Sequence, residues 1–412
     1  MDLNKVKIGV IGLGYVGLPL AVEFGKKYAT LGFDINQNRV NELLAGHDST
    51  LEVSDEELKE APHLQYSYNV GDLKACNLYI VTVPTPIDKH KQPDLTPLIK
   101  ASEMLGKVVD KGDIIVYEST VYPGATEEAC LPVVEQVSGL KFNQDFFAGY
   151  SPERINPGDK EHRVTNILKV TSGSTPDVAE FVDQLYKSII TAGTHKASSI
   201  KVAEAAKVIE NVQRDVNIAL INELYQVFNK LGINTKEIID AAATKWNFMK
   251  LQPGLVGGHC IGVDPYYLLH KSQNSGYIPD LMRKAREIND NMPTFIGQEF
   301  LRNLIIQKIN PVGCKVTMLG FTFKEDCPDT RNTKAYDLYL ILEELGLSVE
   351  VFDPWVDIRE AKIEYPTVKF VERETIAGDV ALLVVGHSSI IADIRSNELA
   401  YSYIYDFKGF LS

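Results

Sequence analysis

The sequence has few cysteines, and their arrangement builds no structural site. Its five cysteines, Cys76, Cys130, Cys260, Cys314 and Cys327, are an odd number at scattered spacings, and no two form a CxxC pair. This pattern predicts neither a disulfide framework nor a zinc site, and no histidine and carboxylate group has metal-ligand spacing. We therefore expect no bound metal, and we expect a reducing compartment, the cytoplasm.

The chain also lacks a long apolar segment and an excess of positive charge. The apolar stretch 8–22 follows Lys5 and Lys7, but its 15 residues include four glycines, which argues against an export signal or a membrane span. The formal net charge of −13 disfavours nucleic-acid binding. With 45% hydrophobic and 24% charged residues among 412, the composition is that of a globular protein with two or three cores.

Short apolar runs alternate with helix-length amphipathic stretches through the first part of the chain, which predicts a parallel sheet covered by helices. The runs are 6–11, 31–33, 78–83, 114–117, 146–148 and 167–170, and we expect them to share one open sheet. From Lys315 the opening pattern returns, because "GFDIN" ends the second run of the first half and "VFDP" ends that of the second. The predicted fold class is α/β, with two Rossmann-like doubly wound domains.

Between these halves, 38 residues from Gly193 to Gly232 contain neither Gly nor Pro. They predict one long helix of about 50 Å, at about 1.5 Å per residue, within a small helical domain. An apolar stripe on this helix comprises Ile209, Val212, Val216, Leu220 and Leu224, and a separate polar stripe comprises Glu204, Lys207, Asn211 and Arg214. A polar stripe on a long helix usually faces water. The predicted domains are 1–195, 196–305 and 306–412.

A glycine-rich loop follows the first apolar run. In "VIGLGYVGLP", Gly12, Gly14 and Gly17 occupy a GxGxxG frame that opens a helix, and Asp34 ends the next strand about twenty residues on. Gly12 is expected to make the tight turn, Gly14 to let the backbone reach a pyrophosphate, and Gly17 to permit close helix packing. Asp34 would bind the ribose hydroxyls and repel a 2′-phosphate. The loop therefore predicts NAD rather than NADP.

Two further loops follow later strands of the same sheet. "VTVPTP" and "YESTVYPG" place Thr85, Ser119 and Thr120 at the predicted nicotinamide end of the cleft. In a third segment, "GGHCIGVDP", three glycines flank Cys260. Glycines let a ligand approach the backbone closely, so we expect this cysteine to meet a small molecule. A thiolate that adds to an aldehyde allows a second hydride to leave and gives a thioester that water hydrolyses to an acid.

Seven motifs that span nearly the whole chain resemble the UDP-glucose/GDP-mannose dehydrogenase family. They are "GLGYVGLP", "VPTP", "ESTVYPG", "YSPERINPG", "KVIEN", "GGHCIGVDP" and "GFTFKEDCPDTRNT", in that order. The resemblance is closest to the bacterial UDP-N-acetylhexosamine 6-dehydrogenases, which carry His before the cysteine as this chain does at His259. It implies an NAD-dependent, four-electron oxidation of UDP-GlcNAc or UDP-GalNAc at C6, for synthesis of surface polysaccharide precursors, by a homodimer.

The resemblance also implies roles for individual residues. The catalytic residues it implies are Cys260 as the nucleophile, Lys207 and Asn211 at the C6 oxygen, Glu153 as acid/base with Thr120 placing water, and Asp264. Those at the cofactor are Gly12, Gly14, Tyr15, Val16, Gly17, Asp34, Arg39, Thr85, Thr120 and Arg331. Those at the substrate are Arg154, Ile155, Lys207, Asn211, Arg214, Gly254, Gly257, His259 and Lys324. The basic members supply local positive charge for a diphosphate.

Several alternatives stay open at this stage. Asp264 before Pro is also typical of a helix N-cap, and His259 could act as a base to Cys260 or contact substrate or backbone. Lys324 and Arg331 could be a solvated charged turn. UDP-ManNAc or UDP-glucose could replace the expected sugar, because epimers differ by about a few kcal/mol in such a site. A one-step dehydrogenase would leave Cys260 idle, and a non-catalytic nucleotide-sugar sensor would form no NADH.

Overall fold

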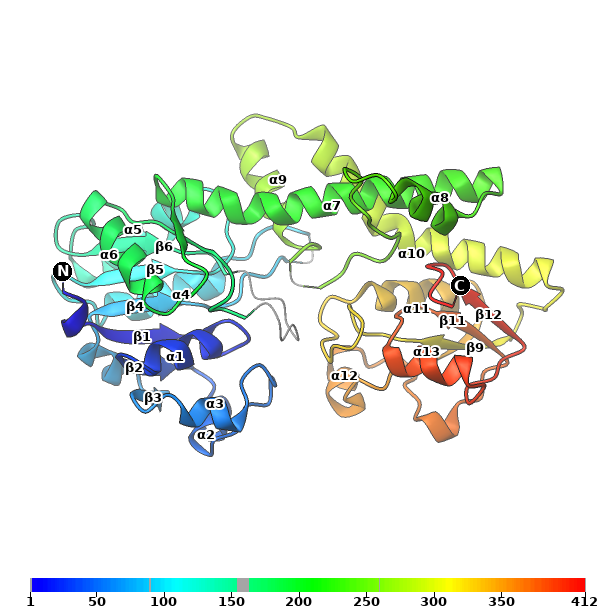
Figure 1. Ribbon diagram of the computed structural model, residues 1–412, viewed down its shortest axis with the longest axis horizontal. Coiled ribbons are helices and arrows are strands. Elements are labelled where there is room, and N and C mark those ends of the chain that lie inside the picture. Colours follow the sequence, from blue (N-terminus) through cyan, green and yellow to red (C-terminus); the bar gives the residue numbers. More distant parts are fainter. Residues whose placement is uncertain (1, 89, 154–162, 259, 412) are drawn as a thin grey trace. The chain divides into compact units, whose positions relative to one another are not determined.

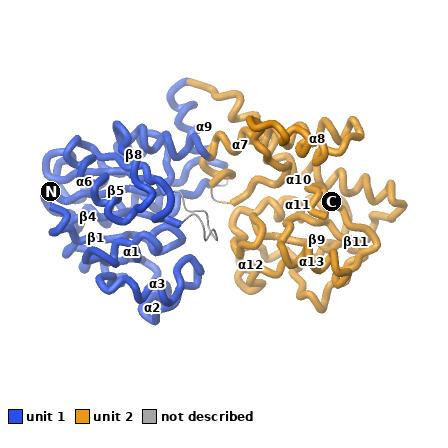
Figure 2. The backbone as a smooth tube through the Cα atoms, viewed as in Figure 1, with its two compact units in different colours: residues 1–210, 266–276 blue, residues 211–265, 277–412 orange. Residues whose placement is uncertain are grey.

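The chain forms two compact units in the computed structural model, which describes all residues except 1, 89, 154–162, 259 and 412. The first unit comprises residues 1–210 and 266–276, and the second comprises residues 211–265 and 277–412 (Figure 2). The chain therefore passes between the units three times. Among the described residues, no helix has the length and apolar composition needed to cross a membrane.

The first unit contains a six-stranded parallel sheet. Its strands are β1 (Lys7–Ile11), β2 (Ala29–Phe33), β3 (Leu64–Ser67), β4 (Leu78–Val81), β5 (Ile114–Tyr117) and β6 (Phe147–Tyr150). They lie in the order β3-β2-β1-β4-β5-β6, the doubly wound arrangement expected for this half. All four residues of β4 and of β5 are buried, as in a sheet covered by helices on both faces. Strands are added in opposite directions on the two sides of the β1–β4 pair. At such a switch point, the carboxyl ends of the two strands border the crevice in which a ligand binds.

Helices cover both faces of this sheet. They are α1 (Gly17–Gly25), α2 (Gln37–Leu44), α3 (Asp55–Lys59), α4 (Thr96–Gly106), α5 (Leu131–Ser138) and α6 (Pro176–Lys187), with the short turns η1 (Leu3–Lys5), η2 (Val70–Ala75) and η3 (Thr126–Cys130). Apolar residues of α1 and α6 pack on one face of the sheet. Those of α4, α5 and the first turn of the long helix α7 (Ile200–Leu231) pack on the other face. α9 (Asp264–Asn274) returns to this unit from residue 266 on.

The expectation that the run 167–170 extends the main sheet is wrong. β7 (Lys169–Thr171) pairs in parallel with β8 (Thr194–Lys196) in a separate two-stranded sheet. Beyond β7 the chain runs antiparallel to β6, with a single bridge between Gly149 and Gly173. A parallel ladder cannot continue there, because the edge of β6 is already occupied by this crossing segment.

A single long helix, α7 (Ile200–Leu231), has 32 residues (Figure 1). The absence of Gly and Pro allows its length. The helix begins just after Ser199, whose Oγ accepts a hydrogen bond from Val202 N. Residues 200–210 belong to the first unit and residues 211–231 to the second. The predicted long central helix is confirmed.

The second unit contains a smaller sheet. Its strands β9 (Lys315–Leu319), β10 (Ser348–Phe352), β11 (Val380–Leu383) and β12 (Tyr403–Asp406) are parallel and lie in the order β10-β9-β11-β12. Its other elements are α8 (Thr235–Ala242), α10 (Asp280–Ile306), α11 (Lys334–Glu344), α12 (Ile358–Glu364), η4 (Arg373–Thr375) and α13 (Ser388–Arg395). The predicted second Rossmann-like sheet is therefore present, and its direction changes between β9 and β11.

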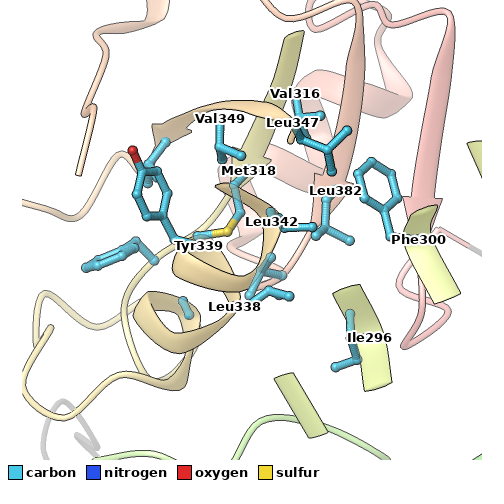
Figure 3. Close-up of a cluster of buried hydrophobic side chains, with 14 of the residues drawn as sticks. Ile296, Phe300, Val316, Met318, Leu338, Tyr339, Leu342, Leu347, Val349 and Leu382 are labelled. Atoms are coloured by element: carbon cyan, nitrogen blue, oxygen red, sulfur yellow. The ribbon is translucent and has the colours of Figure 1, made fainter. Parts of the chain in front are cut away.

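The core of the second unit lies between this sheet and two helices. Ile296 and Phe300 of α10 and Leu338 and Leu342 of α11 contact the buried face of the strands, including Met318 (Figure 3). A smaller cluster under α13 covers the opposite face. The carboxyl ends of the strands are left for loops, which is where a ligand binds in open α/β sheets.

Candidate active site

The glycine-rich loop lies between β1 and α1, at the carboxyl end of the first sheet. Gly12 has a φ of +94°, a backbone conformation that residues with a side chain rarely adopt. A Cβ on Gly17 would lie 1.8 Å from the Gly12 carbonyl oxygen, whereas a Cβ on Gly14 would meet no protein atom within 4 Å. The first glycine thus makes the turn, the third allows close packing, and the second faces open space. This cradle fits a dinucleotide pyrophosphate at the N-terminus of α1.

Asp34 follows β2 and closes this loop. Its Oδ2 accepts a hydrogen bond of 2.8 Å from Leu13 N, and its Oδ1 accepts one of 2.8 Å from Asn36 N. These bonds fix the carboxylate beside the glycine loop, where a carboxylate is expected to bind ribose. A carboxylate has lone pairs left for two hydroxyl donors.

Arg39, a predicted cofactor contact, makes internal bonds. Its Nε donates to the Leu13 carbonyl at 2.9 Å, and its Nη2 pairs with Asp48 at 2.6 Å. Burial alone would raise the pKa of Asp48, but hydrogen bonds from Thr50 and Val53 and the Arg39 cation hold this pKa below its ordinary value. Arg39 therefore braces the backbone that follows Gly12, and its contact with the cofactor stays a prediction.

The loops after β4 and β5 are joined to each other at the mouth of the cleft. Ser119 Oγ donates to the Val83 carbonyl at 2.5 Å, and Thr82 Oγ1 donates to the Gly12 carbonyl at 2.8 Å. Thr85 and Thr120 lie half-buried on these two loops. The segments predicted from "VTVPTP" and "YESTVYPG" are thus brought together in the first unit, next to the glycine loop.

A buried ionic cluster lies beside the β5 loop. Lys169 Nζ is 2.7 Å from Glu118 Oε2 and 2.7 Å from Glu153 Oε2, and the Tyr186 hydroxyl donates to Glu118. Burial raises the pKa of Glu118 to about 7. Only Glu153 of this cluster is among the residues predicted from the sequence. The signal for the others is Lys169 inside the apolar run "ILKV", where an unpaired lysine would be costly.

The polar stripe of α7 faces protein, so the expectation that such a stripe faces water fails here. Glu204, Lys207 and Asn211 are 0%, 8% and 4% exposed, although Arg214 is exposed. Glu204 accepts hydrogen bonds from the backbone of Gly124 and Thr126, which makes it a structural residue. Lys207 and Asn211 are the other two buried members of this polar stripe.

The apolar stripe has the opposite character. Ile209 is 54% exposed and Leu220 is 52% exposed, whereas Val212 is buried. Side chains at 202, 220, 227 and 231 share this exposed face, because their spacings from 209 are whole numbers of turns to within about 40°. An exposed apolar face on a long helix is typical of a surface that binds another protein.

Cys260 is exposed on a loop whose backbone is held by buried groups of the second unit. Asn222 bonds both the N–H and the carbonyl of Gly254, at 2.8 and 3.1 Å. Arg286 Nη1 lies 3.3 Å from the Ile261 carbonyl, and its 2.6 Å pair with Asp215 anchors it in the core. These hydrogen bonds hold the backbone on both sides of Cys260, whose own side chain is exposed.

Asp264 and Asn211 are brought together at the end of this loop. Asn211 Nδ2 donates to Asp264 Oδ2 at 2.5 Å, and both side chains are buried. α9 begins at Asp264 itself, and Asp264 N donates to the Cys260 carbonyl at 2.8 Å. The carboxylate therefore ties α7 to the first turn of α9, four residues from the cysteine.

The glycines around Cys260 serve packing within the second unit. A Cβ on Gly257 would lie 2.6 Å from the Asn332 carbonyl oxygen, and one on Gly258, where φ is +77°, would lie 2.8 Å from the Phe323 ring. Both glycines are therefore needed for packing within the second unit, and their expected role at a ligand stays a prediction. Their small size lets the loop that carries Lys324 and Arg331 approach closely. Asn332 of that loop donates a hydrogen bond of 2.9 Å from its Nδ2 to the Gly258 carbonyl.

That same loop borders a cavity of about 70 Å³ at the carboxyl ends of β9 and β11. Gly257, Lys324 and Lys408 are among the lining residues. Asp353 ends β10 as Asp34 ends β2, and its carboxylate accepts a 2.6 Å bond from Phe321 N, as Asp34 does from Leu13 N. The two halves of the chain thus repeat one loop-closing device.

Three predicted residues, Arg154, Ile155 and His259, lie outside the described residues. Arg331 forms a two-bond ion pair with Asp329. Roles at a ligand for Tyr15, Val16, Thr85, Arg331 and the remaining site residues stay predictions. The domain division at 195 and 305 likewise stays a prediction.

The doubly wound sheet with its glycine loop and ribose-side carboxylate defines the class of protein, a dinucleotide-dependent oxidoreductase. Residues 6–190 match the NAD binding domain of the UDP-glucose/GDP-mannose dehydrogenase family, residues 201–291 its central domain, and residues 317–412 its UDP binding domain. The chain belongs to the UDP-glucose/GDP-mannose dehydrogenase family. NAD is accordingly its cofactor.

Individual relatives are similar over nearly their whole length. A UDP-N-acetyl-D-glucosamine 6-dehydrogenase of Pseudomonas aeruginosa is 59% identical over 99% of this chain and 98% of its own. A protein of the same name from Salmonella typhi is 54% identical over 98% and 96%. The solved structure of a UDP-D-ManNAc dehydrogenase from Pyrococcus horikoshii has a TM-score of 0.88 at 30% identity and covers 98% of this chain and 96% of that one.

Proposed function

We propose that this chain oxidises a UDP-N-acetylhexosamine, UDP-GlcNAc or UDP-GalNAc, at C6 to the uronic acid. Two relatives above 50% identity are named UDP-N-acetyl-D-glucosamine 6-dehydrogenase, which supports this substrate class over UDP-glucose. UDP-ManNAc is the nearest alternative, because the solved structure with a TM-score of 0.88 carries that sugar in its name. The product is a precursor of surface polysaccharides in this proposal.

The chemistry divides among the residues of this chain. Lys207 and Asn211 hydrogen-bond the C6 oxygen as negative charge develops on it. Loss of the hydroxyl proton and of one hydride turns the C6 alcohol into an aldehyde. The Cys260 thiolate then adds to this carbon, and loss of a second hydride from the adduct leaves a thioester. Glu153 then takes a proton from water as the water oxygen bonds to the thioester carbon, and the carbon–sulfur bond breaks to release the thiolate. NAD held by Gly12, Gly14 and Asp34 supplies the hydride acceptor.

One observation carries this proposal. The exposed Cys260 lies on a loop that the buried Asn211 and Asp264 close through a 2.5 Å hydrogen bond, and Lys207 precedes Asn211 by one turn of α7. A one-step dehydrogenase or a silent sensor has no use for a nucleophile fixed beside such a pair. Asp264 serves here to orient Asn211.

The substrate contacts proposed for the second unit follow the cavity at its strand ends. Lys324 and Gly257 line this cavity, and Lys408 adds a second positive charge, which suits a diphosphate. Gly254, held by Asn222, and the exposed Arg214 complete the described members of the proposed set. Which epimer fits best depends on contacts of the sugar ring.

The test counts NADH per sugar and compares UDP-GlcNAc, UDP-GalNAc, UDP-ManNAc and UDP-glucose. We expect two NADH per sugar and the highest kcat/KM with an N-acetylhexosamine. Cys260→Ser should abolish acid formation while NAD binding survives, whereas the control Cys314→Ala should retain both. One NADH per sugar, or normal turnover by Cys260→Ser, would remove the thioester route. No NADH with any of the four sugars would favour the sensor.

We further propose a homodimer that assembles through the exposed face of α7 and works in the cytoplasm. Leu220, Val227 and Leu231 of this face are 52%, 44% and 63% exposed, and Trp246 nearby in sequence is 97% exposed. All five cysteines are free, which suits a reducing compartment. Leu220→Glu should shift the mass measured by light scattering from dimer to monomer, and the control Ile363→Glu, at an exposed apolar site away from α7, should not.

A further inference from the structure

The loop from β9 to α11, residues 320–333, is longer than the glycine loop of the first unit, and it carries Lys324. Two of its residues, Asp326 and Asn332, have a left-handed backbone with φ of +53° and +52°. Residues other than glycine adopt this conformation at a cost, so surrounding contacts must hold them in it. Asn332 is held by its hydrogen bonds with Gly258, and Asp326 is held at the start of α13.

The imidazole of His387 contacts this loop at two places. His387 directly precedes α13, and it is 0% exposed. Its Nδ1 accepts a hydrogen bond of 2.9 Å from Asp326 N, and its Nε2 lies 3.1 Å from Thr322 Oγ1. Thr322 Oγ1 in turn donates to the Lys324 carbonyl at 3.0 Å. One buried ring therefore holds the loop on both sides of Lys324.

These contacts fix which nitrogen of the ring carries the proton. A backbone N–H can only donate, so Nδ1 uses its lone pair toward Asp326 N, and the proton is on Nε2. Nε2 lies 2.9 Å from Asp353 Oδ2, which accepts this proton. Burial alone would raise the pKa of Asp353, but hydrogen bonds from His387 and from two backbone N–H groups hold this pKa below its ordinary value. The ionised carboxylate thus keeps the ring in the tautomer that presents Nδ1 to the loop.

The loop also binds α13 in the reverse direction. His387 is the N-cap residue of α13, and its side chain makes no cap hydrogen bond to that helix. The Asp326 carboxylate instead accepts from Ser388 N at 3.0 Å and from Ser388 Oγ at 2.5 Å. Asp326 thus satisfies a backbone donor at the helix start, while His387 satisfies the backbone donor of Asp326.

We propose that His387 is a positioning residue for the UDP-sugar, because its Nδ1 holds the loop in the shape that keeps Lys324 at the cavity beyond β9 and β11. Lys324 is among the residues that line this cavity. The inference rests on the proposed role of Lys324 at the diphosphate. Without the bond from Asp326 N to the ring, the left-handed turn loses a partner and the loop loosens. The nucleotide must then order the loop when it binds, which weakens binding.

Two substitutions at His387 separate the two ring nitrogens. In His387→Asn the amide reaches the place of Nδ1, so its oxygen can accept from Asp326 N, but the bond to Asp353 is lost. In His387→Gln the amide reaches the place of Nε2, so its nitrogen can donate to Asp353, but the bond from Asp326 N is lost. We expect His387→Gln to raise the Kd for UDP at least about fivefold. His387→Asn should leave this Kd within about twofold of the parent value.

A purely structural role for His387 predicts the opposite order. If the ring only filled the core and satisfied Asp353, His387→Asn would be the more harmful change, and the melting temperature and the affinity for UDP would fall together. Titration calorimetry with UDP and thermal unfolding measure both quantities, and NAD serves as the control ligand. The Kd for NAD should change less than about twofold in both variants. Equal Kd values for UDP in the two variants, or weaker binding by His387→Asn, would overturn the inference.

A second pair of variants tests the loop without changing the buried ring. Ser388→Ala removes the 2.5 Å hydrogen bond to Asp326, and Ser389→Ala changes the next residue of α13, which is exposed as Ser388 is. Ser388→Ala should raise the Kd for UDP about two- to tenfold, and Ser389→Ala should not change it. Where the His387 variants do not fold, equal Kd values in these two serine variants overturn the inference.

Lys324→Ala separates this inference from the function on which it rests. Loss of the ammonium should raise the Kd for UDP at least about fivefold. If Lys324→Ala binds UDP normally, the proposed role of Lys324 at the diphosphate is wrong. If Lys324→Ala binds UDP weakly while His387→Gln and His387→Asn bind it equally well, the role of Lys324 stands and the inference about His387 is overturned.

Discussion

Two alanine substitutions, one at Gly14 and one at Gly17, separate the dinucleotide-binding role of the glycine loop from its packing role. A Cβ on Gly14 meets no protein atom within 4 Å, and Gly14 is not among the glycines with positive φ. A Cβ on Gly17 would lie 1.8 Å from the Gly12 oxygen and 2.4 Å from Thr82 Oγ1. The first change should therefore affect only a bound molecule, and the second should affect the fold.

The structure sets the size of each effect. In Gly17→Ala the helix and the loop must separate by about 1.5 Å, an overpacking that costs about 3 kcal/mol at the upper end of its usual range, or about 6–12 °C in the melting temperature of a unit of this size. In Gly14→Ala the new methyl stands where the pyrophosphate would approach the backbone. Loss of one charge-assisted hydrogen bond, about 1.5–3 kcal/mol, raises the Kd for NAD about 10- to 150-fold.

Calorimetry measures both quantities, the Kd by titration with NAD and the melting temperature by heating. Gly14→Ala should melt within about 2 °C of the parent chain and bind NAD weakly. Gly17→Ala should melt early with or without NAD. If Gly14→Ala binds NAD normally, the pyrophosphate does not lie on this loop, and if Gly17→Ala melts normally, the close packing assigned to that glycine is wrong.

Two further effects follow from buried groups. Asn222→Ala leaves the Gly254 N–H and carbonyl without their side-chain partner, which costs about 1–3 kcal/mol. It should therefore raise the KM for the UDP-sugar about 5- to 150-fold, while the Kd for NAD changes less than about twofold; equal changes in both constants would contradict a local role. Burial raises the pKa of Asp113 and of Glu204 to about 6, from 3.8 and 4.5. The folded chain therefore holds more protons than the unfolded chain between these values, and stability should rise as the pH falls from about 7 to about 5. The melting temperature should follow, and Glu204→Gln should flatten the dependence; a melting temperature that falls steadily over this range would refute the assignment.

Local sequence patterns were sufficient to predict the elements that bind the cofactor. The frame Gly12, Gly14 and Gly17 needs only a strand before it and a helix after it, and Asp34 needs only to end the next strand. The long helix α7 follows from the absence of Gly and Pro, and the second sheet follows from the repeated "FD" endings. Each of these inferences depends on neighbours in the sequence, where backbone preference and side-chain periodicity act.

Contacts between distant segments were beyond such patterns. Glu118 and Lys169 are 51 positions apart, and Asn222 and Gly254 are 32 apart, so only the fold brings them together. β7 is apolar like a sheet strand, yet it pairs with β8 outside the main sheet, and its continuation at Gly173 crosses the edge of β6 antiparallel. The close packing of Gly257 and Gly258 against Asn332 and Phe323 likewise joins segments that are distant in the sequence.

The predicted catalytic residues come from both units, which the course of the chain explains. Glu153 and Lys207 belong to the first unit, and Asn211, Cys260 and Asp264 belong to the second. The chain changes unit between Lys207 and Asn211, within one turn of an uninterrupted helix, and again just after Asp264. A continuous helix fixes the separation of residues one turn apart. The hydrogen bond from Asn211 to Asp264 therefore ties the loop that carries Cys260 to α7 within the second unit.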